Sequence, residues 1–216
     1  TARARALFIS RKVLAIDIPL LAILGGGLGW LLARHDFRGR ELVSLLVQLP
    51  IVLPPSVLGL YLLFALGGVP FLREAGLLFA FPAAVLGALV PSLPIMVQAA
   101  RAAFSGVDRT LEEAALTLGR GRWEVFRRVT LPLSRRMLLV GLALSSARAL
   151  GDFGVTLMVA GNIPGRTQTL PLYIYGQVES LNFARANAAA LLLVGVGIGS
   201  LWLVRRMEAG SHERLA

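Results

Sequence analysis

The sequence predicts an all-α membrane protein, a polytopic helical bundle of about five transmembrane helices that forms a single domain over residues 1–216. Two observations predict this fold class. Of the 216 residues, 56% are hydrophobic and only 16% are charged, and the charged residues gather between long apolar stretches. A helix needs about 20 mainly apolar residues to cross roughly 30 Å of hydrocarbon. Stretches of that length cover residues 13–33, 42–66, 77–100, 137–160 and 184–204.

Charge and residue types exclude several functions. The formal net charge is +10, but the basic residues lie between apolar runs instead of on one soluble face, so no nucleic-acid partner is expected. Cysteine is absent, which leaves no thiolate ligand. His35 falls in a short loop and His212 in the C-terminal tail, without neighbours at metal-ligand spacing, so no metal site is expected.

Basic residues set the predicted orientation, because lysine and arginine are retained on the cytoplasmic side. The connections 34–41, 67–76, 101–136, 161–183 and 205–216 hold three, one, eight, one and three of them. This alternation places the central loop and the C-terminus in the cytoplasm and the N-terminus outside. Basic residues at positions 3, 5, 11 and 12 oppose that placement. An upstream helix absent from this chain, which begins with Thr1 instead of Met and shows no signal-peptide pattern, or tolerance of a short basic tail would account for them.

The first span contains one acidic residue and a pair of glycines. Asp17 lies near the predicted outer end, where a carboxylate can reach water, and it has no assigned role. Gly25 and Gly29 have the small-x-x-x-small spacing that allows helices to approach closely, as do Gly195 and Gly199 in the last span. Ordinary bundle packing is the expected use of both pairs.

Prolines interrupt the second and third spans. The second contains Pro50, Pro54 and Pro55, and the third contains Pro82, Pro91 and Pro94. Each proline removes a helix hydrogen bond that has to be replaced inside a bundle or beside a water-lined cavity. We therefore expect broken helices in both spans, of the kind that suits a transport pathway.

The fourth span carries the candidates for a pathway or gate. Arg148 lies 12 residues beyond Arg136, about 18 Å along a helix, which places it near the bilayer centre. Asp152 follows at i+4, so the two side chains can meet on one helix face. A mutual ion pair that tightens the bundle and a role in the pathway remain equally open. Hydroxyl groups in this region, which ordinarily bond to backbone or to neighbouring membrane helices, belong to Ser145, Ser146 and Thr156.

The central loop, residues 101–136, predicts a short amphipathic helix. Asp108 or Thr110 can cap its start, and Gly119 stands where a helix ends in a left-handed residue. Apolar residues at i, i+3, i+4 and i+7 are Leu111, Ala114, Ala115 and Leu118. A second helical turn, around Trp123, Phe126 and Val129, is expected to close at Leu131 and Pro132. A partner's groove and the lipid headgroups suit such a helix equally well.

The same loop resembles a known signature. Glu113, Ala114 and Ala115, then three residues, Gly119, nine residues and Val129-Thr130-Leu131-Pro132 resemble the E-A-A-x3-G-x9-I-x-L-P motif of the membrane permease subunits of bacterial ATP-binding cassette (ABC) importers, with valine in place of isoleucine. The resemblance implies a cytoplasmic coupling helix that docks in a cleft of a separate ATPase subunit. The coupling residues that it implies are Glu112, Glu113, Ala114, Ala115, Leu118, Gly119, Leu131 and Pro132.

Three further stretches, 49–67, 91–108 and 147–175, look like the molybdate and tungstate branch of these permeases, with the sulfate branch close behind. The branch assignment depends mainly on the NIPG-x-TQTLP run and on PPSVLGLYLL. Two features depart from the branch. Asp152 stands where relatives commonly have glutamate, and the extra N-terminal helix usual in the branch is missing.

The resemblance implies an ATP-driven importer that carries an oxyanion, molybdate or tungstate before sulfate or thiosulfate, across a bacterial inner membrane. The implied partners are an ATPase subunit at the coupling helix, an external oxyanion-binding protein at the outer loop 161–183, a second permease copy that completes a homodimer, and membrane lipid. ATP and Mg²⁺ are assigned to the ATPase, because the chain has no G-x4-G-K-[ST] loop. The chain itself is expected to be no enzyme and to hold no cofactor.

Two other classes remain as alternatives. A stand-alone secondary transporter often shows inverted internal repeats, and none is apparent. A membrane-embedded enzyme needs a convergent polar set, and the spans offer only Arg148, Asp152 and scattered hydroxyls.

Overall fold

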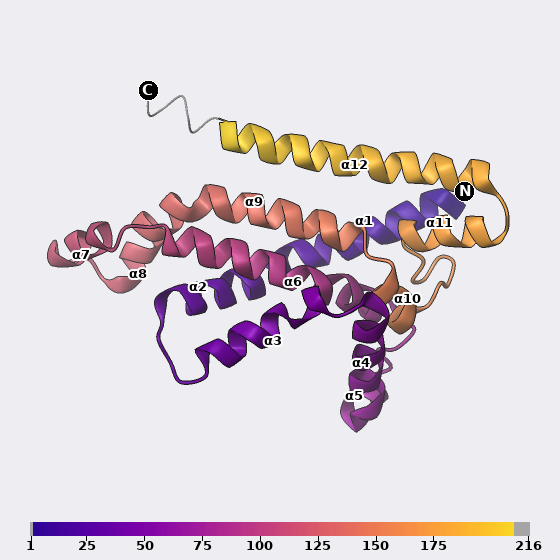
Figure 1. Cartoon of the computed structure of the whole chain (residues 1–216), viewed down its shortest axis with the longest axis horizontal. Coiled ribbons are helices and arrows are strands. Elements are labelled where there is room, and N and C mark those ends of the chain that lie inside the picture. Colours follow the sequence, from indigo (N-terminus) through magenta and orange to yellow (C-terminus); the bar gives the residue numbers. More distant parts are fainter. Residues whose placement is uncertain (1, 210–216) are drawn as a thin grey trace.

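The computed structural model describes residues 2–209, and the regular elements within those residues are all helices (Figure 1). This confirms the predicted all-α class. Their order is α1 (Ala2–Leu20), η1 (Leu21–Gly25), α2 (Gly26–Arg34), α3 (Arg40–Val52), α4 (Pro55–Gly68), α5 (Pro70–Glu74), α6 (Phe81–Ser105), α7 (Arg109–Thr117), α8 (Arg122–Val125), η2 (Phe126–Thr130), α9 (Leu131–Leu150), α10 (Gly154–Ala160), α11 (Leu170–Glu179) and α12 (Phe183–Ala209). The elements η1 and η2 are single π-helical turns.

Among the described residues, two helices are long and apolar enough to cross a membrane alone, Phe81–Ser105 and Phe183–Trp202. Two bent pairs raise the number of candidate spans to four if each pair counts as one span. These spans correspond to the last four of the five predicted stretches.

The first predicted stretch belongs to a longer helix than expected. The elements α1, η1 and α2 follow one another without a break, so the helix begins at Ala2 instead of residue 13. Pro19 lies inside α1, and the π turn η1 begins two residues later. A proline removes one backbone donor, and a π turn is a common way for a helix to absorb such a local defect.

Gly25 and Gly29 bring this first helix close to α6. A Cβ built on Gly29 would lie 2.4 Å from the Cβ of Ala100, and one built on Gly25 would lie 2.5 Å from the Cγ of Met96. Only glycine allows such an approach. The expected packing role is therefore confirmed for this pair. Around Gly195 and Gly199, by contrast, nothing lies within 4 Å of the built Cβ, so the second pair makes no close helix contact within the described residues.

The second predicted span is broken, as its prolines indicate. Helices α3 and α4 meet at an angle of 120° across Leu53 and Pro54. After this bend, α4 and α5 leave the bundle sideways (Figure 1). The stretch 42–66 is therefore no straight span.

The third predicted span is not broken, which corrects the expectation from its prolines. Helix α6 runs through Pro91 and Pro94, and Pro82 falls in its first turn, where a missing donor is harmless. Ser92 donates its hydroxyl hydrogen to the carbonyl of Ala88, 2.7 Å away. Helix α6 lies at the centre of the bundle and packs against α2, α9 and α10. Packing on several sides holds a proline-containing helix together where an exposed one would break.

The fourth span differs at both ends from the prediction. Leu131 and Pro132 do not close a helical turn, because α8, η2 and α9 form one continuous helix from Arg122 to Leu150. The wide π turn η2 comes just before Pro132 and accommodates it. The helix then ends near Gly151, and α10 continues at an angle of 58°. The predicted stretch 137–160 is thus one helix and part of a second.

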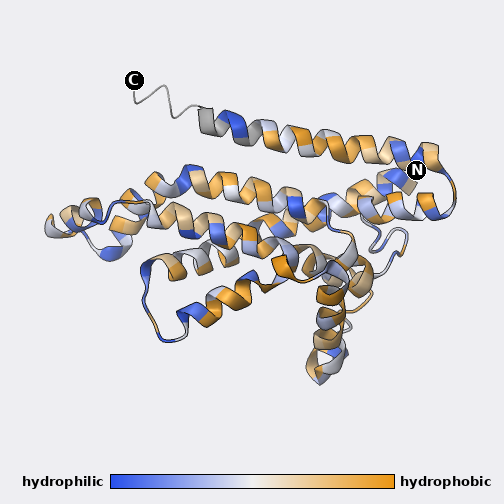
Figure 2. Cartoon of the chain, viewed as in Figure 1, coloured by the Kyte–Doolittle hydropathy of each residue, from blue (hydrophilic) through white to orange (hydrophobic). Residues whose placement is uncertain are grey.

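The last predicted span, 184–204, lies within the longer helix α12, which confirms it. Helix α11, which precedes it, was not predicted. Helix α12 is apolar along much of its length (Figure 2). It packs against α11 and one side of α9, but most of its apolar surface stays exposed. His212 lies outside the described residues. The start of α1 and helix α11 lie at one end of the molecule, and α7 and α8 lie at the other (Figure 1).

Candidate functional site

Helix α7 forms the tip of one end of the molecule, and its first turn is capped by Asp108. The carboxylate of Asp108 accepts a hydrogen bond from the backbone N–H of Thr110 at 2.9 Å. This settles the choice between the two predicted capping residues. The hydrogen bonds from Thr110 also hold the pKa of Asp108 below its ordinary value, so the carboxylate stays charged where the helix dipole favours a negative charge.

Gly119 ends α7 in the way that the sequence predicts. Its φ of +80° lies in the left-handed region, where a side chain would be strained. The N–H of Arg120 donates to the carbonyl of Ala115 at 3.3 Å, and the N–H of Gly119 donates to the carbonyl of Leu116 at 3.0 Å. This is a Schellman motif, which fixes the direction of the chain after the helix.

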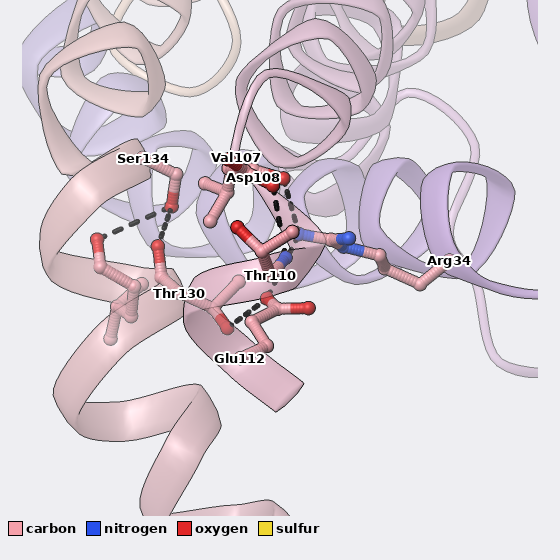
Figure 3. Close-up of polar contacts among 8 residues, drawn as sticks. Arg34, Val107, Asp108, Thr110, Glu112, Thr130 and Ser134 are labelled. Carbon is pink, nitrogen blue, oxygen red and sulfur yellow. Dashed lines mark hydrogen bonds and ion pairs between the residues drawn. The ribbon is translucent and has the colours of Figure 1, made fainter. Parts of the chain in front are cut away.

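Glu112 ties α7 to two other helices (Figure 3). Its Oε1 accepts hydrogen bonds from Arg34 Nη2, at 2.9 Å, and from the hydroxyl of Thr130. Arg34 ends α2, and Thr130 ends η2 just before α9. The side chains of Arg34 and Glu112 are only 10% and 18% exposed. Glu112, predicted as one member of a docking surface, therefore points into the bundle.

The other predicted coupling residues divide into two groups. Glu113, Ala114, Leu118 and Gly119 are exposed, with Leu118 at 82%, and Ala115 is half-buried. These residues leave α7 with an outward surface free for a partner. Leu131 and Pro132 are also exposed but belong to α9, beyond the π turn. The structure thus brings together α7 and its terminating glycine, and it leaves Leu131 and Pro132 outside that helix.

A cleft of about 610 Å³ lies between α7, α8 and the end of α2. Its walls include the aromatic side chains of Trp30, Trp123 and Phe126, which stack or meet edge to face, and the charged Arg34 and Glu112. The cleft opens beside the outward surface of α7. Apolar walls with a few charged groups suit an inserted protein segment.

The pathway or gate candidates of the fourth span fall into two groups. Arg148 Nη1 lies 3.2 Å from Asp152 Oδ1, and Asp152 Oδ2 accepts from the N–H and the hydroxyl of Thr156 at 3.0 and 2.9 Å. Ser145 instead donates to the carbonyl of Leu142 in its own helix. Ser146 lines an apolar groove between α9 and α12. The structure therefore joins Arg148, Asp152 and Thr156 and leaves both serines apart.

Asp17 is the residue that the sequence placed wrongly. It was expected to reach water, but it is 0% exposed, and neither carboxylate oxygen has a hydrogen-bond partner among residues 2–209. It borders a small cavity together with Ser10, Asp152 and Thr169. Because the helix begins at Ala2, Asp17 lies near its middle and not at its end. If the predicted span had begun at residue 2 instead of residue 13, Asp17 would have been placed near the middle of the helix.

Membrane-length helices, two of them broken, that carry a capped amphipathic helix at one end define a class, that of polytopic helical membrane proteins. Residues 25–211 match the family described as "Binding-protein-dependent transport system inner membrane component", and the chain belongs to that family.

Individual relatives and solved structures extend this result. The chain is 39% identical to the "Molybdenum transport system permease protein ModB" of Escherichia coli, over 95% of this chain and 96% of the relative. It is 41% identical to the protein of that name from Haemophilus influenzae, over 83% of each chain. A "Sulfate transport system permease protein CysW" from Synechococcus elongatus is 34% identical, over 93% of this chain and 73% of the relative.

The fold is similar to that of ABC transporters. The MetNI methionine ABC transporter matches with a TM-score of 0.71 at 15% identity, over 94% of this chain and 95% of that one. A bacterial ABC transporter involved in alginate import matches with a TM-score of 0.70 at 17% identity, over 94% and 79%.

Proposed function

We propose that the chain is the permease subunit of an ATP-driven importer that carries molybdate or tungstate across the bacterial inner membrane. The observation that carries the proposal is the match over nearly the whole chain to relatives named as molybdenum transport permeases. Sulfate is the second candidate substrate, because the sulfate permease of Synechococcus elongatus is 34% identical over 93% of this chain. Both substrates are tetrahedral oxyanions.

In this proposal α7 is the coupling helix, and its outward surface docks on an ATPase subunit. The exposed Glu113 and Leu118, with the adjacent cleft, supply charged and apolar contacts. ATP and Mg²⁺ belong to the ATPase, which the absence of a phosphate-binding glycine loop from the sequence supports. The end that carries α7 is cytoplasmic, as is the C-terminus, and the start of α1 is outside.

Two copies of the chain form the pathway, and an external oxyanion-binding protein delivers the ion at the opposite end. Closure of the two ATPase subunits moves both coupling helices. Each α7 passes this motion to α2 and η2 through Glu112, Arg34 and Thr130. The bundle then changes from inward-facing to outward-facing and receives the released oxyanion.

The substrate is tested with the reconstituted complex of permease, ATPase and binding protein in vesicles. ATP hydrolysis and uptake are measured with molybdate, tungstate or sulfate as the oxyanion. We expect molybdate and tungstate to stimulate both activities more than sulfate. Stimulation by sulfate alone would assign the chain to the second candidate, and oxyanion flux without ATP would instead indicate a secondary transporter.

Coupling is tested with the double variant Glu113→Ala and Gly119→Ala. The first change removes an exposed contact, and the second places a side chain at a φ of +80°, which costs roughly 1–2 kcal/mol. We expect the ATPase subunit to be lost on purification while the permease stays in the membrane. Gly121→Ala is the matched control, because Gly121 has a φ of −71° and open space around it. Normal ATP-driven uptake by the double variant contradicts the assignment of α7.

A further inference from the structure

A cavity of about 230 Å³ lies where the second span is broken. Its walls include Ile51, Leu53 and Pro55 from the α3–α4 bend, and Pro91 and Ile95 from α6. Arg148 is the one charged side chain that lines it among the described residues. A cation in an otherwise apolar membrane cavity is expensive to maintain and marks a functional position.

The partner of Arg148 does not face this cavity. Asp152 is 1% exposed, and both of its oxygens are already occupied, Oδ1 by Arg148 and Oδ2 by Thr156. It borders the small cavity around Asp17 on the other side. Asp152 therefore bonds to the guanidinium of Arg148 on the side away from this cavity, so the negative charge of Asp152 does not face the α3–α4 bend.

Arg148 keeps unused hydrogen-bonding capacity toward the cavity. Its side chain is 37% exposed, and within the described residues only Nη1 has a hydrogen-bond acceptor. A guanidinium carries five N–H donors in a fixed plane, a geometry that matches two oxygens of one oxyanion. Nε and Nη2 are thus available to an anion.

We propose that Arg148 forms a transient subsite for a tetrahedral oxyanion in the translocation pathway, with Asp152 and Thr156 as positioning residues. This inference rests on the proposed function and deepens it. Asp152 balances part of the charge of Arg148 from the side away from the cavity, so an arriving oxyanion meets a directed pair of donors and a weaker attraction than an unpaired arginine would exert. A pathway needs sites of this kind, because an ion has to enter them and also leave.

The first test uses the chain's lack of cysteine. Ile51→Cys places a thiol on the cavity wall, and Val52→Cys, on the exposed neighbouring residue outside the cavity, is the matched control. Both are treated, within the assembled complex, with an anionic and a cationic methanethiosulfonate reagent of similar size. We expect the anionic reagent to modify Ile51→Cys about fivefold faster or more, as one nearby positive charge favours, and molybdate to slow that reaction. The control should show neither effect. Equal rates at position 51, without protection by molybdate, overturn the subsite.

The second test separates the subsite from a purely structural ion pair. The double variant Arg148→Gln with Asp152→Asn keeps a hydrogen-bonding amide at each position but removes both charges. A structural pair predicts molybdate uptake per ATP hydrolysed equal to that of the wild type. The subsite predicts a loss of about tenfold or more at an unchanged thermal midpoint, and Arg148→Lys should recover part of it.

The two proposals fail in different ways. If the wild-type complex transports no oxyanion with ATP, the proposed function fails. If the wild type transports molybdate and the neutral double variant does so equally well, only the subsite fails. Should the double variant not fold, the labelling rates at position 51, measured with Arg148 intact, still decide the proposal.

Discussion

Glu112 and Glu113 show how docking on a partner and contact with the bundle can fall to two adjacent side chains. It lies beside Glu113 in the sequence, yet one carboxylate bonds to Arg34 and Thr130 while the other faces outward. The period of a helix places neighbours about 100° apart, so adjacent residues serve different surfaces. The sequence predicted the helix and its ends but could not tell which glutamate faces inward, because that depends on where α2 and η2 lie.

The variant Glu112→Gln tests this division. Removing the charge leaves the mostly buried Arg34 without its carboxylate, and hydrogen bonds to charged groups contribute about 1.5–3 kcal/mol. We expect the ATPase subunit to remain bound and to hydrolyse ATP with reduced oxyanion uptake, measured as ions carried per ATP. Glu113→Gln is the control and should weaken ATPase binding instead. An unchanged transport ratio in Glu112→Gln means that α7 transmits its motion by another route.

Asp17 is a second residue whose effect on the protein depends on where it lies in the structure. Its carboxylate is fully buried and has no hydrogen-bond partner in the part of the chain that the structure describes, an arrangement that destabilises the folded state.

The substitution Asp17→Asn should therefore keep or raise the thermal midpoint of the detergent-solubilised protein, because it removes the charge and keeps the shape. Asp152→Asn is the comparison and should lower the midpoint, since Asp152 is bonded to Arg148 and Thr156. A larger loss for Asp17→Asn than for Asp152→Asn indicates that Asp17 has a stabilising partner in solution.

At the scale of elements, the prolines show where prediction from sequence ends. Pro54 and Pro55 break the second span, whereas Pro91 and Pro94 leave α6 intact. The local chemistry of a proline is the same in both helices. Helix α6 is enclosed by its neighbours and α3 is largely exposed, and a single sequence does not reveal this difference. A single sequence does not reveal the π turn before Pro132 either, because that turn also depends on how neighbouring helices pack.

The contact between α2 and α6 gives a prediction at this scale. In Gly29→Ala the new Cβ meets the Cβ of Ala100 at 2.4 Å and the carbonyl oxygen of Val97 at 2.8 Å. Backbone atoms cannot move away easily, and overpacking of this kind costs about 1–3 kcal/mol. We expect a lower thermal midpoint by fluorescence-detected size exclusion. Gly27→Ala, on the same helix with nothing within 4 Å, should be neutral or stabilising. Equal midpoints for the two variants refute the close contact.

At the scale of the whole molecule, its two ends have distinct roles in the proposal. The arginine-rich end carries α7 and α8, and the opposite end carries the start of α1, helix α11 and the loop before it (Figure 1). The sequence predicted these opposite placements from basic residues alone. It could not predict helix α11 or the sideways course of α4 and α5, which depend on contacts between distant segments.

Single cysteines test the proposed orientation. Arg3→Cys, Gly121→Cys and Arg166→Cys replace exposed residues in a chain without native cysteine. With a thiol reagent that cannot cross the inner membrane, positions 3 and 166 should react from outside, and position 121 should react only after the membrane is opened. Protection of position 3 in intact cells places the N-terminus in the cytoplasm and overturns the predicted topology.

The long first helix has a mechanical consequence. It approaches α6 closely at Gly25 and Gly29, and five residues beyond Gly29 its Arg34 is held by Glu112 of α7. Five residues, about 7 Å, separate Gly29 from Arg34, and 23 residues, about 35 Å, separate Gly29 from Ala6 at the helical rise. These two lengths, measured from Gly29, are in a ratio of roughly one to five. If the helix turns as one body about Gly29, a displacement of about 1 Å at Arg34 becomes about 5 Å at Ala6, which packs against Leu170 and Tyr173.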